Sequence, residues 1–554
     1  NATPLSQNYQ LAMGGNTKIL KNDFGAIMAL TYQNSRKTIF VERNDFDVDT
    51  GAIYRYVDTQ WKENIMMGGM INFAYKIGEN NKISLKNMMN INAEDMVVER
   101  NGTHFENDRY ENGTTLQYIS NAILTSQLSG EHFLPKSKIK IKWGGAFTKM
   151  NRDMPNLRRV MSFRSFGDTV WYAAVSTAPS TNYAGIFFSD LHDKIYTANT
   201  DASIPFKLFR KKHSIKFGGS VQYKLRGFNA RAFGYKIGNT GKFDWGLLSY
   251  GHDSIFSSEN IGRPDNSGFM LAETTNPSDN YDASSNLHTG FIMFDNNIAK
   301  KLRFIWGARV ENYKLHLDAY EYDGDTVKID TMYFDLLPSA NIVYAVNEMS
   351  NARFAISRTL CRPEFREIAP FSFFDFNTFS AIIGNDTLQQ TRIMNYDLKY
   401  EIYPGLNQML AVGAFYKSFI SPIENSMFYG GAGSRSRSLQ NVKGAVNYGL
   451  ELEYRFKLSV LDSLFKTKYM GNFTLSSNFV CIYSAVYLTG TKGIDAEQIT
   501  RPLQGQSPYI INTGLQYLGP KSKTGISILF NKYGRRISEV GSNGYNDIYE
   551  ASRS

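Results

Sequence analysis

Apolar and polar residues alternate along most of this chain, and this period of two restricts its fold more than any other feature. In residues 138–148, Ile139, Ile141 and Trp143 alternate with lysines and small residues. Because successive side chains of a β-strand point to opposite faces, the pattern predicts a strand with one apolar and one polar face. The same alternation recurs in residues 214–224, 302–311 and 448–458.

The length of the alternating segments distinguishes a membrane barrel from a soluble β-fold. Soluble strands have about five or six residues, whereas about ten residues are needed to cross a bilayer at a tilt, and several segments reach that length. We therefore predict an all-β protein, a transmembrane antiparallel β-barrel with about 18 strands in this chain and an expected total of about 22. The apolar faces, with Ile139, Ile141 and Trp143 as examples, are expected to face lipid, whereas Lys138, Lys140 and Lys142 are expected to face the lumen or to lie near a barrel end.

Short turns and longer polar segments alternate between the expected strands, as at the two ends of a membrane barrel. The expected short turns are residues 78–81, 135–137, 211–212 and 519–521. The expected long loops are residues 153–189, 238–284, 362–391 and 489–506.

Composition excludes several other classes. No run of 18 apolar residues occurs, which argues against an ordinary transmembrane helix. The formal charge of +10 is scattered rather than clustered, so we expect no nucleic-acid partner. Cys361 and Cys481 are too few to specify a disulfide framework, and we expect two unpaired thiols.

The chain shows no linker or low-complexity tract, so residues 1–554 are expected to form one outer-membrane β-barrel domain. Strand-like sequence begins near the first residues, and residues 549–554 resemble the entry to another strand. Because a barrel in lipid must close, these ends predict that an N-terminal plug and the last strands are missing. They also predict a lumen free of the chain's own residues.

A series of short motifs between residues 351 and 456 is more specific than the alternation. In chain order the motifs are residues 362–371, 384–388, 395–401, 413–417, 422–424 and 447–453, followed by residues 501–509. This succession resembles the barrel of the TonB-dependent receptors of Bacteroidetes. The resemblance implies a bacterial outer-membrane location, with membrane lipid and the TonB complex as partners, and admits a surface lipoprotein or another outer-membrane subunit.

The residues that carry the resemblance are interpreted first as structural. They are Arg362, Pro363, Glu364, Arg366, Pro370, Gly384, Asn385, Asn395, Tyr396, Asp397, Glu401, Phe415, Tyr416, Pro422, Glu424, Gly449 and Glu451. Proline ends a strand because it lacks the ladder donor, and a Gly-Asn pair suits a turn. One strand face carries Asn395, Asp397, Lys399 and Glu401, which in a lumen would form hydrogen-bonded ladders with Arg358 or Arg366 or meet a plug.

An aromatic run lies in the expected loop of residues 362–391. Its members are Phe371, Phe373, Phe374 and Phe376. Such a cluster could serve as a ligand platform, but packing within the loop or an interfacial girdle is the more frequent arrangement.

Motifs for catalysis and cofactors are missing from the sequence. The seven histidines show no metal spacing, and no H-E-x-x-H, paired-cysteine, phosphate-loop or nucleophile-elbow motif occurs. We therefore expect no enzyme activity, no cofactor and no metal.

Two functions fit these features. The first is a TonB-dependent outer-membrane transporter that imports a scarce solute, and the second is a non-transporting barrel that serves as a scaffold or partner-binding subunit. A plug and a TonB-contacting segment upstream of Asn1 would favour the first. The sequence does not specify the solute, since the resemblance admits iron chelates, cobalamin, oligosaccharides and peptides.

Overall fold

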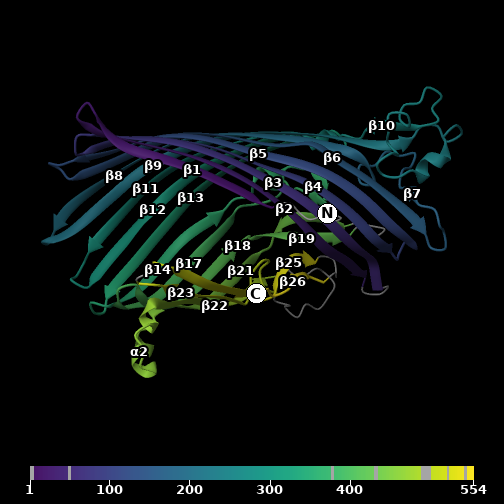
Figure 1. The fold of residues 1–554 in the computed structure, drawn as a ribbon. Helices are drawn as coiled ribbons and strands as arrows, with labels where there is room; N and C mark the ends of the chain where they lie inside the picture. The colour runs from purple at the N-terminus through teal and green to yellow at the C-terminus, as the bar shows by residue number, and fades with distance from the viewer. Residues whose placement is uncertain are drawn as a thin grey trace.

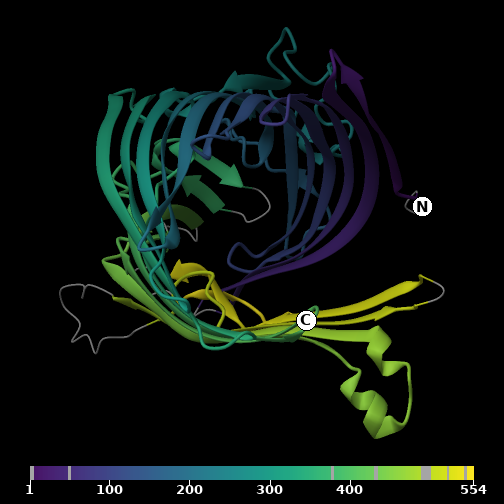
Figure 2. The ribbon, with the colours of Figure 1, turned by 90° about the vertical axis from the view of Figure 1, so that its left-hand side faces the viewer.

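The computed structural model describes residues 5–47, 51–375, 380–429, 435–487, 501–520, 523–541 and 546–553. Its main feature is a sheet of 20 strands that arches around a lumen (Figures 1 and 2). Eighteen of these strands follow one another in chain order, each antiparallel to the next. The expectation of an all-β chain with about 18 long strands is confirmed.

The first half of the sheet contains eight main strands, and all of them except β1 are longer than any other described strand. They are β1 (Gln7–Ile19), β2 (Asn22–Asp47), β3 (Gly51–Ile77), β4 (Asn81–His104), β5 (Arg109–Leu134), β6 (Ile139–Ser165), β8 (Ala184–Leu208) and β9 (Lys211–Ile237). The short strands β7 (Tyr172–Ala173) and β10 (Phe269–Glu273) pair with the ends of β6 and β9. Strands β2 to β9, β7 excepted, have 24 to 27 residues. They therefore extend well beyond the about ten residues that cross a bilayer.

The second half of the sheet has shorter strands. They are β11 (Tyr281–Asn297), β12 (Leu302–Tyr320), β13 (Thr326–Ala345), β14 (Ser350–Cys361), β17 (Thr391–Gly405), β18 (Gln408–Ile420), β21 (Gly444–Lys457), β22 (Phe473–Tyr487), β23 (Tyr509–Leu518) and β24 (Gly525–Tyr533). Among the described residues, β1 pairs only with β2 and β24 only with β23. Figure 2 shows these two edges of the arch apart.

Tight turns join the strands at one end of the arch, here called the turn end. The turns expected at residues 78–81 and 135–137 lie between strands there, with Asn81 as the first residue of β4. Of the turn expected at residues 519–521, Gly519 and Pro520 follow β23, and Lys521 lies outside the described residues. The turn expected at residues 211–212 lies instead at Phe209 and Arg210, and both lysines begin β9. Phe209 and Arg210 have φ values of 48° and 61°, as a two-residue hairpin turn requires, although neither is a usual residue for it.

Long segments join strands at the opposite end, the loop end. The loop expected at residues 362–391 is confirmed, and most of residues 489–506 lie outside the described part of the chain. The expectation for residues 153–189 was wrong at both ends, because β6 continues to Ser165 and β8 begins at Ala184. Pro155 and its polar neighbours lie in a register shift between Met154 and Leu157, where a bulge accommodates a residue without a ladder donor.

The range predicted for the loop at residues 238–284 extended too far at its C-terminal end. β11 begins at Tyr281, and β10 forms within the segment. The polar residues at the start of β11 resemble loop sequence, but they continue the ladder with β9 and β12.

The outward face of the arch carries a band of apolar residues near the turn end. Phe147 of β6 packs on Tyr196 of β8 with ring centroids 5.1 Å apart, and Ile139, Ile141 and Trp143 share that strand face with Phe147. Lys142 lies on the opposite face, where its Nζ is 3.3 Å from Glu131 Oε2. The apolar residues and Lys142 thus lie on opposite faces of this strand, as the alternation predicts.

The apolar band has a defined height. On β6 it extends over residues 139–147, which at about 3.3 Å per residue gives roughly 26 Å along the strand. At a tilt of about 40° this length spans about 20 Å of membrane thickness, somewhat less than the apolar band of about 25 Å in outer-membrane barrels. Beyond it, the outward positions are Lys149, Asn151 and Asp153. The remaining length of the long strands therefore projects past the membrane at the loop end.

A row of tyrosines crosses the second half of the outward face. Tyr396, Tyr416, Tyr448 and Tyr483 are successive register partners on β17, β18, β21 and β22, and all four are exposed. Tyrosine is enriched at membrane interfaces, where its ring and hydroxyl meet different environments. Two of the motif residues, Tyr396 and Tyr416, therefore belong to a row of exposed aromatic rings.

Segments from the loop end form a second sheet of six strands, here called the inner sheet. Its strands are β15 (Ser372–Asp375), β16 (Ser380–Ile383), β19 (Ile423–Tyr429), β20 (Arg435–Asn441), β25 (Arg536–Gly541) and β26 (Ile548–Glu550). Figure 2 shows them inside the arch. Arg435 Nη2 of β20 is 2.7 Å from Asp45 Oδ1 of β2, and the ring of Phe373 in β15 is 5.3 Å from that of Phe187 in β8.

The inner sheet therefore touches two separate parts of the wall and crosses the lumen at the loop end. The expectation of a lumen free of the chain's own residues was wrong there, because the loops fold inward instead of standing out in solvent. Apolar residues hold them in place: Phe365 and Ile368 pack with Leu315 and Leu317 of the wall in one buried cluster.

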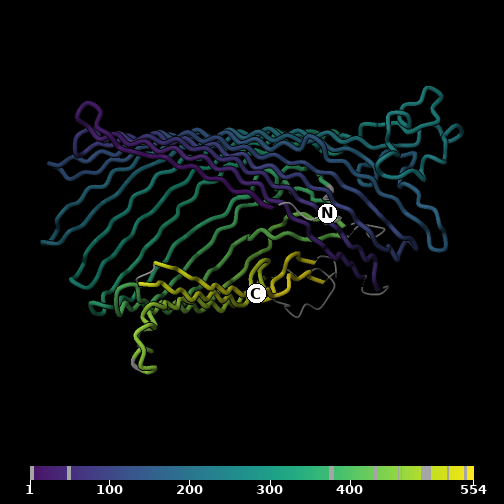
Figure 3. Tube along the Cα trace, in the orientation of Figure 1, coloured from purple at the N-terminus to yellow at the C-terminus, as the bar shows by residue number. Residues whose placement is uncertain are grey.

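Short helices complete the described chain. They are α1 (Phe365–Ile368), α2 (Val460–Phe465), and the 3₁₀ segments η1 (Trp245–Ser249), η2 (Pro277–Asp279) and η4 (Met470–Asn472). Helix α2 protrudes from the turn end, as the chain trace in Figure 3 also shows. None of the helices in the described ranges has the length and apolarity of a membrane span.

Candidate functional site at the loop end

The segment that follows β14 is fixed to the wall at its first residues. Arg362 Nη2 lies 2.9 Å from Glu311 Oε2 of β12, and its guanidinium lies 4.5 Å from the ring centroid of Tyr313. Pro363 is buried and ends the strand as expected. Glu364 forms an ion pair with Lys224 of β9, in which Oε2 and Nζ are 3.4 Å apart. Arg362 and Glu364 therefore direct the chain inward.

The same segment covers a gap between β13 and β14. These strands pair only as far as Ser339 and Ser357, which leaves the buried carboxylate of Asp335 without a strand neighbour on that side. Gln390 Nε2 donates to it at 2.7 Å and Arg392 Nε at 3.1 Å. A buried carboxylate is costly unless it is paired and hydrogen-bonded, so these two residues stabilise the opening in the wall.

Helix α1 and the turn after β16 pack closely together. A Cβ on Gly384 would lie 1.8 Å from the carbonyl oxygen of Ala369, so only glycine fits. Asn385 Nδ2 donates to the Leu439 carbonyl at 2.8 Å and so ties this turn to β20. Arg366 donates to the Ile382 carbonyl at 3.1 Å, and burial lowers the pKa of its guanidinium.

The segment after β18 is fixed by a buried ion pair. Glu424 of β19 is 1% exposed. Its Oε1 accepts a hydrogen bond from Arg501 Nη1 at 3.0 Å, and its Oε2 accepts one from Arg501 Nη2 at 2.6 Å. The backbone N–H of Gln504 adds a third bond at 2.9 Å. Pro422 is buried beside the start of β19, and its carbonyl accepts the N–H of Val442 at 3.0 Å. Glu424 thus joins the inner sheet to the chain that enters β23.

The motif residues on the wall form cross-strand contacts, but not with the expected arginines. Asn395 Nδ2 donates to Thr359 Oγ1 at 3.0 Å, and Glu401 accepts Arg353 Nε at 2.7 Å. The expected partners Arg358 and Arg366 do not contact these wall residues in the described part of the chain. Arg358 lies on the outward face of β14, and Arg366 lies in α1.

The other wall positions show why particular residue types occur there. A Cβ on Gly449 would lie 2.2 Å from the Cys481 carbonyl and 2.9 Å from the ring of Phe415, so glycine lets that ring pack flat on the lumen wall. Asp397 and Glu451 are exposed on the lumen face, with no ion pair among the described residues. Both carboxylates are therefore open to a partner in the lumen.

A cavity of about 880 Å³ lies between the inner sheet and the wall. The β6–β8 loop, the β10–β11 segment, the β12–β13 turn and strands β15 and β16 all contribute to its lining. Its charged and aromatic lining residues include Arg159, Glu273, Asp279, Glu321, Phe187 and Phe373. The volume lies within the range of about 300 to 1,000 Å³ that is common for ligand pockets.

Sequence reasoning located this cavity only in part. Of the motif residues Pro370 lines it, and so does Phe373 of the aromatic run. Phe371 is buried instead against Phe228, with ring centroids 4.9 Å apart, and Phe376 lies outside the described residues. The other lining residues lie in the loop-end parts of several strands and in the loops of that end, where no motif occurs. The length of the loops was the only sequence signal for this region.

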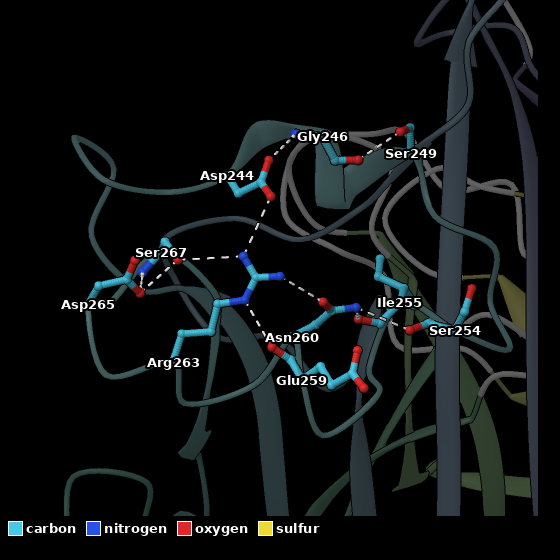
Figure 4. A network of polar contacts seen from close by, with 10 residues as sticks. All are labelled: Asp244, Gly246, Ser249, Ser254, Ile255, Glu259, Asn260, Arg263, Asp265 and Ser267. Atoms are coloured by element: carbon cyan, nitrogen blue, oxygen red, sulfur yellow. Dashed lines mark hydrogen bonds and ion pairs between the residues drawn. The ribbon is translucent and has the colours of Figure 1, made fainter.

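Residues 238–268 form a separate unit on the outward side of the loop end. Figure 4 shows its central hydrogen-bond network, in which Arg263 donates to the Glu259 carbonyl and to Asn260 Oδ1, both at 2.9 Å. His252 fixes the unit to the wall, with Nδ1 2.9 Å from Thr114 Oγ1 and Nε2 2.9 Å from Ser162 Oγ. Burial lowers the pKa of His252, so the ring is held neutral.

Metal chemistry finds no support in the described part of the chain, where no group of three His, Cys, Asp or Glu side chains could hold an ion. Cys361 and Cys481 are both free and exposed. What the loop end offers is a cavity with polar and aromatic walls, suited to reversible binding.

Fold and loop-end geometry together define a transmembrane β-barrel whose loops fold into its own lumen. The chain belongs to the outer membrane protein beta-barrel family, whose model matches residues 232–538. That match includes the loops that form most of the inner sheet. The predicted outer-membrane location is thereby confirmed. No curated protein matches the sequence.

Solved structures of outer-membrane receptors share this fold. The ferripyoverdine receptor of Pseudomonas aeruginosa has a TM-score of 0.58 at 11% identity, covering 100% of this chain and 65% of the receptor. The ferric-catecholate import receptor Fiu of E. coli K12 has a TM-score of 0.56 at 11% identity, covering 99% and 73%. The siderophore receptor PirA of Acinetobacter baumannii has a TM-score of 0.54 at 10% identity, covering 100% and 73%.

At these identities the likeness concerns the fold alone. The chain spans 65% of the length of the receptor in the FpvAI–pyocin S2 complex and of the ferripyoverdine receptor. Their ligands are therefore properties of those proteins.

Proposed function

We propose that this chain forms the barrel of an outer-membrane transporter, which captures a solute at its loop end and imports it with energy supplied through TonB. The cavity between the inner sheet and the wall is the observation that carries the proposal. The order of the motifs, which resembles the receptors of Bacteroidetes, supports it, and so does the fold shared with the siderophore receptors. The protein binds and releases its solute unchanged, without enzymatic conversion.

The location of the cavity fits capture from outside the cell. It lies at the loop end, beyond the apolar band, and long loops of outer-membrane barrels face the exterior. One wall of the cavity consists of β15 and β16 of the inner sheet. A solute that leaves the cavity toward the periplasm must therefore pass the inner sheet.

Movement of the inner sheet requires an energy source. Arg435 of the inner sheet binds Asp45 of β2, and Phe373 of the inner sheet packs on Phe187 of β8. Displacement of the sheet breaks such contacts, each of which stabilises the closed arrangement. Coupling to TonB is the source that the resemblance implies.

The proposal is tested by solute uptake in cells that produce the full-length protein. Mass spectrometry of the medium identifies solutes that these cells deplete, with and without an uncoupler of the proton gradient. Substitution Ala381→Trp should fill the cavity and abolish depletion, whereas Ala299→Trp in an exposed turn at the other end should leave it unchanged. Depletion that is absent, or that survives both the uncoupler and Ala381→Trp, would contradict the proposal and favour a scaffold.

A further inference from the structure

Acidic groups outnumber basic groups in the cavity. Glu273, Asp279 and Glu321 contribute carboxylates, and Arg159 is the one basic residue among the described lining residues. This balance is opposite to the formal charge of +10 of the whole chain. The cavity is therefore a local exception to the charge of the protein.

The three carboxylates differ in the partners that they bind within the protein. Glu273 is bound by Arg231 at 3.0 and 3.1 Å and by Thr275 at 2.8 Å. Asp279 is buried and accepts the N–H of Asn276 at 2.8 Å. The side chain of Glu321 is exposed and has no ion pair in the part of the chain that the structure describes. Glu321 is thus the carboxylate available to a ligand.

Aromatic rings lie in the same cavity as this carboxylate. Tyr322 follows Glu321 in the chain and is 76% exposed. Phe373 and Phe187 form a pair with centroids 5.3 Å apart, and both line the cavity. A carboxylate together with open aromatic faces suits a cation, because the ring quadrupole and the negative charge attract the same group.

The remaining polar lining is uncharged. Ser180, Asn182, Thr274 and Ser372 offer hydroxyl and amide groups, which can donate to or accept from a polar ligand. An anionic ligand would instead meet the free carboxylate of Glu321, and like charges repel at short range.

From these observations we infer that the cavity binds a cationic ligand, a polar molecule that carries an ammonium or guanidinium group, with Glu321 as the residue that selects its charge. This inference rests on the proposed function, since it names the chemical class of the solute. The ion pair forms with Glu321, the rings of Tyr322 and Phe373 cover the cation, and the hydroxyl and amide groups hold the rest of the ligand.

The test compares three peptides that differ only in charge: Lys-Gly-Lys, Gln-Gly-Gln and Glu-Gly-Glu, with blocked termini. Binding to the full-length protein in detergent is measured by calorimetry at low salt. We expect the lysine peptide to bind at least about tenfold more tightly than the glutamate peptide, and less tightly as salt is added. Glu321→Gln should weaken lysine-peptide binding about two- to fivefold, as loss of one exposed ion pair implies.

Glu348→Gln is the matched control, because Glu348 is an exposed carboxylate in the turn between β13 and β14 at the other end. The inference is overturned if the lysine peptide fails to bind, if the glutamate peptide binds as tightly, or if Glu321→Gln has no greater effect than Glu348→Gln. Its failure is distinguishable from that of the proposed function. Energised uptake of an anionic solute would overturn only the ligand class, and the expected charge order without energised uptake would overturn only transport.

Discussion

The ion pair between Glu424 and Arg501 should control the stability of the inner sheet. Glu424→Gln keeps the size of the side chain but leaves a guanidinium, 11% exposed, without its counter-charge. Removal of one partner from a buried ion pair costs about 3 to 5 kcal/mol, and we expect about 3 kcal/mol because the glutamine can still accept the N–H of Gln504. At 1.4 kcal/mol per factor of ten, the local opening equilibrium rises by roughly 100-fold.

Hydrogen exchange read by mass spectrometry measures this opening. Amides of β19 and β20, which bond to each other from Ile423 to Tyr429, should exchange up to about 100-fold faster in Glu424→Gln. Peptides of the wall strand β11 should not change. Glu451→Gln is the control, since that carboxylate is exposed on the wall. The anchoring role would be refuted if β19 were equally protected from exchange in the wild type and in Glu424→Gln. It would also be refuted if β11 lost as much protection as β19 in that variant.

Three further predictions concern packing, lipid contact and pH. Gly384→Ala should destabilise the inner sheet by about 1 to 3 kcal/mol, since the added Cβ would lie 1.8 Å from the Ala369 carbonyl oxygen. Gly145→Ala is the control for the same exchange assay. Its added Cβ would lie 3.9 Å from the nearest atom, so this substitution should have little effect. Ile141→Arg should cost about 2 to 4 kcal/mol in urea unfolding from lipid vesicles, and an unchanged midpoint would refute the assigned face. Burial lowers the pKa of His252 below its ordinary 6.5, so the unfolded loop binds more protons in acid and the stability of residues 238–268 falls as pH drops below about 6.5. Trp245 fluorescence should report this loss between pH 7 and 5, and a His252→Gln variant with the same pH dependence would contradict it.

The sequence predicts the wall well because each strand follows a local rule. Alternation at Ile139, Ile141 and Trp143 depends only on which face meets lipid, and the register of neighbours preserves it. The predicted strand and turn boundaries were wrong where a residue type is compatible with two local structures. Pro155 resembles a loop residue but lies in a bulge, and Phe209 adopts a positive φ that its residue type does not indicate.

The inner sheet and the cavity were beyond sequence reasoning for a different reason. Arg435 and Asp45 are 390 residues apart, and no periodicity connects them. Arg362 and Glu424 form ion pairs in the structure, but their partners are set by the inward path of the loops, which no local pattern indicates. Glu321, which defines the charge of the cavity, lies in a short turn with no motif.

The most direct test of the account is to fix the inner sheet to the wall. Asp45→Cys and Arg435→Cys, in a background with Cys361→Ser and Cys481→Ser to remove the exposed native thiols, can be joined by a short bis-maleimide on cells that produce the full-length protein. Because these side chains meet across the lumen at 2.7 Å, the account predicts that cross-linking abolishes energised solute uptake. Each single-cysteine variant, treated with the same reagent, should retain uptake. Undiminished uptake by fully cross-linked protein would show that the inner sheet does not have to move, and would contradict the account.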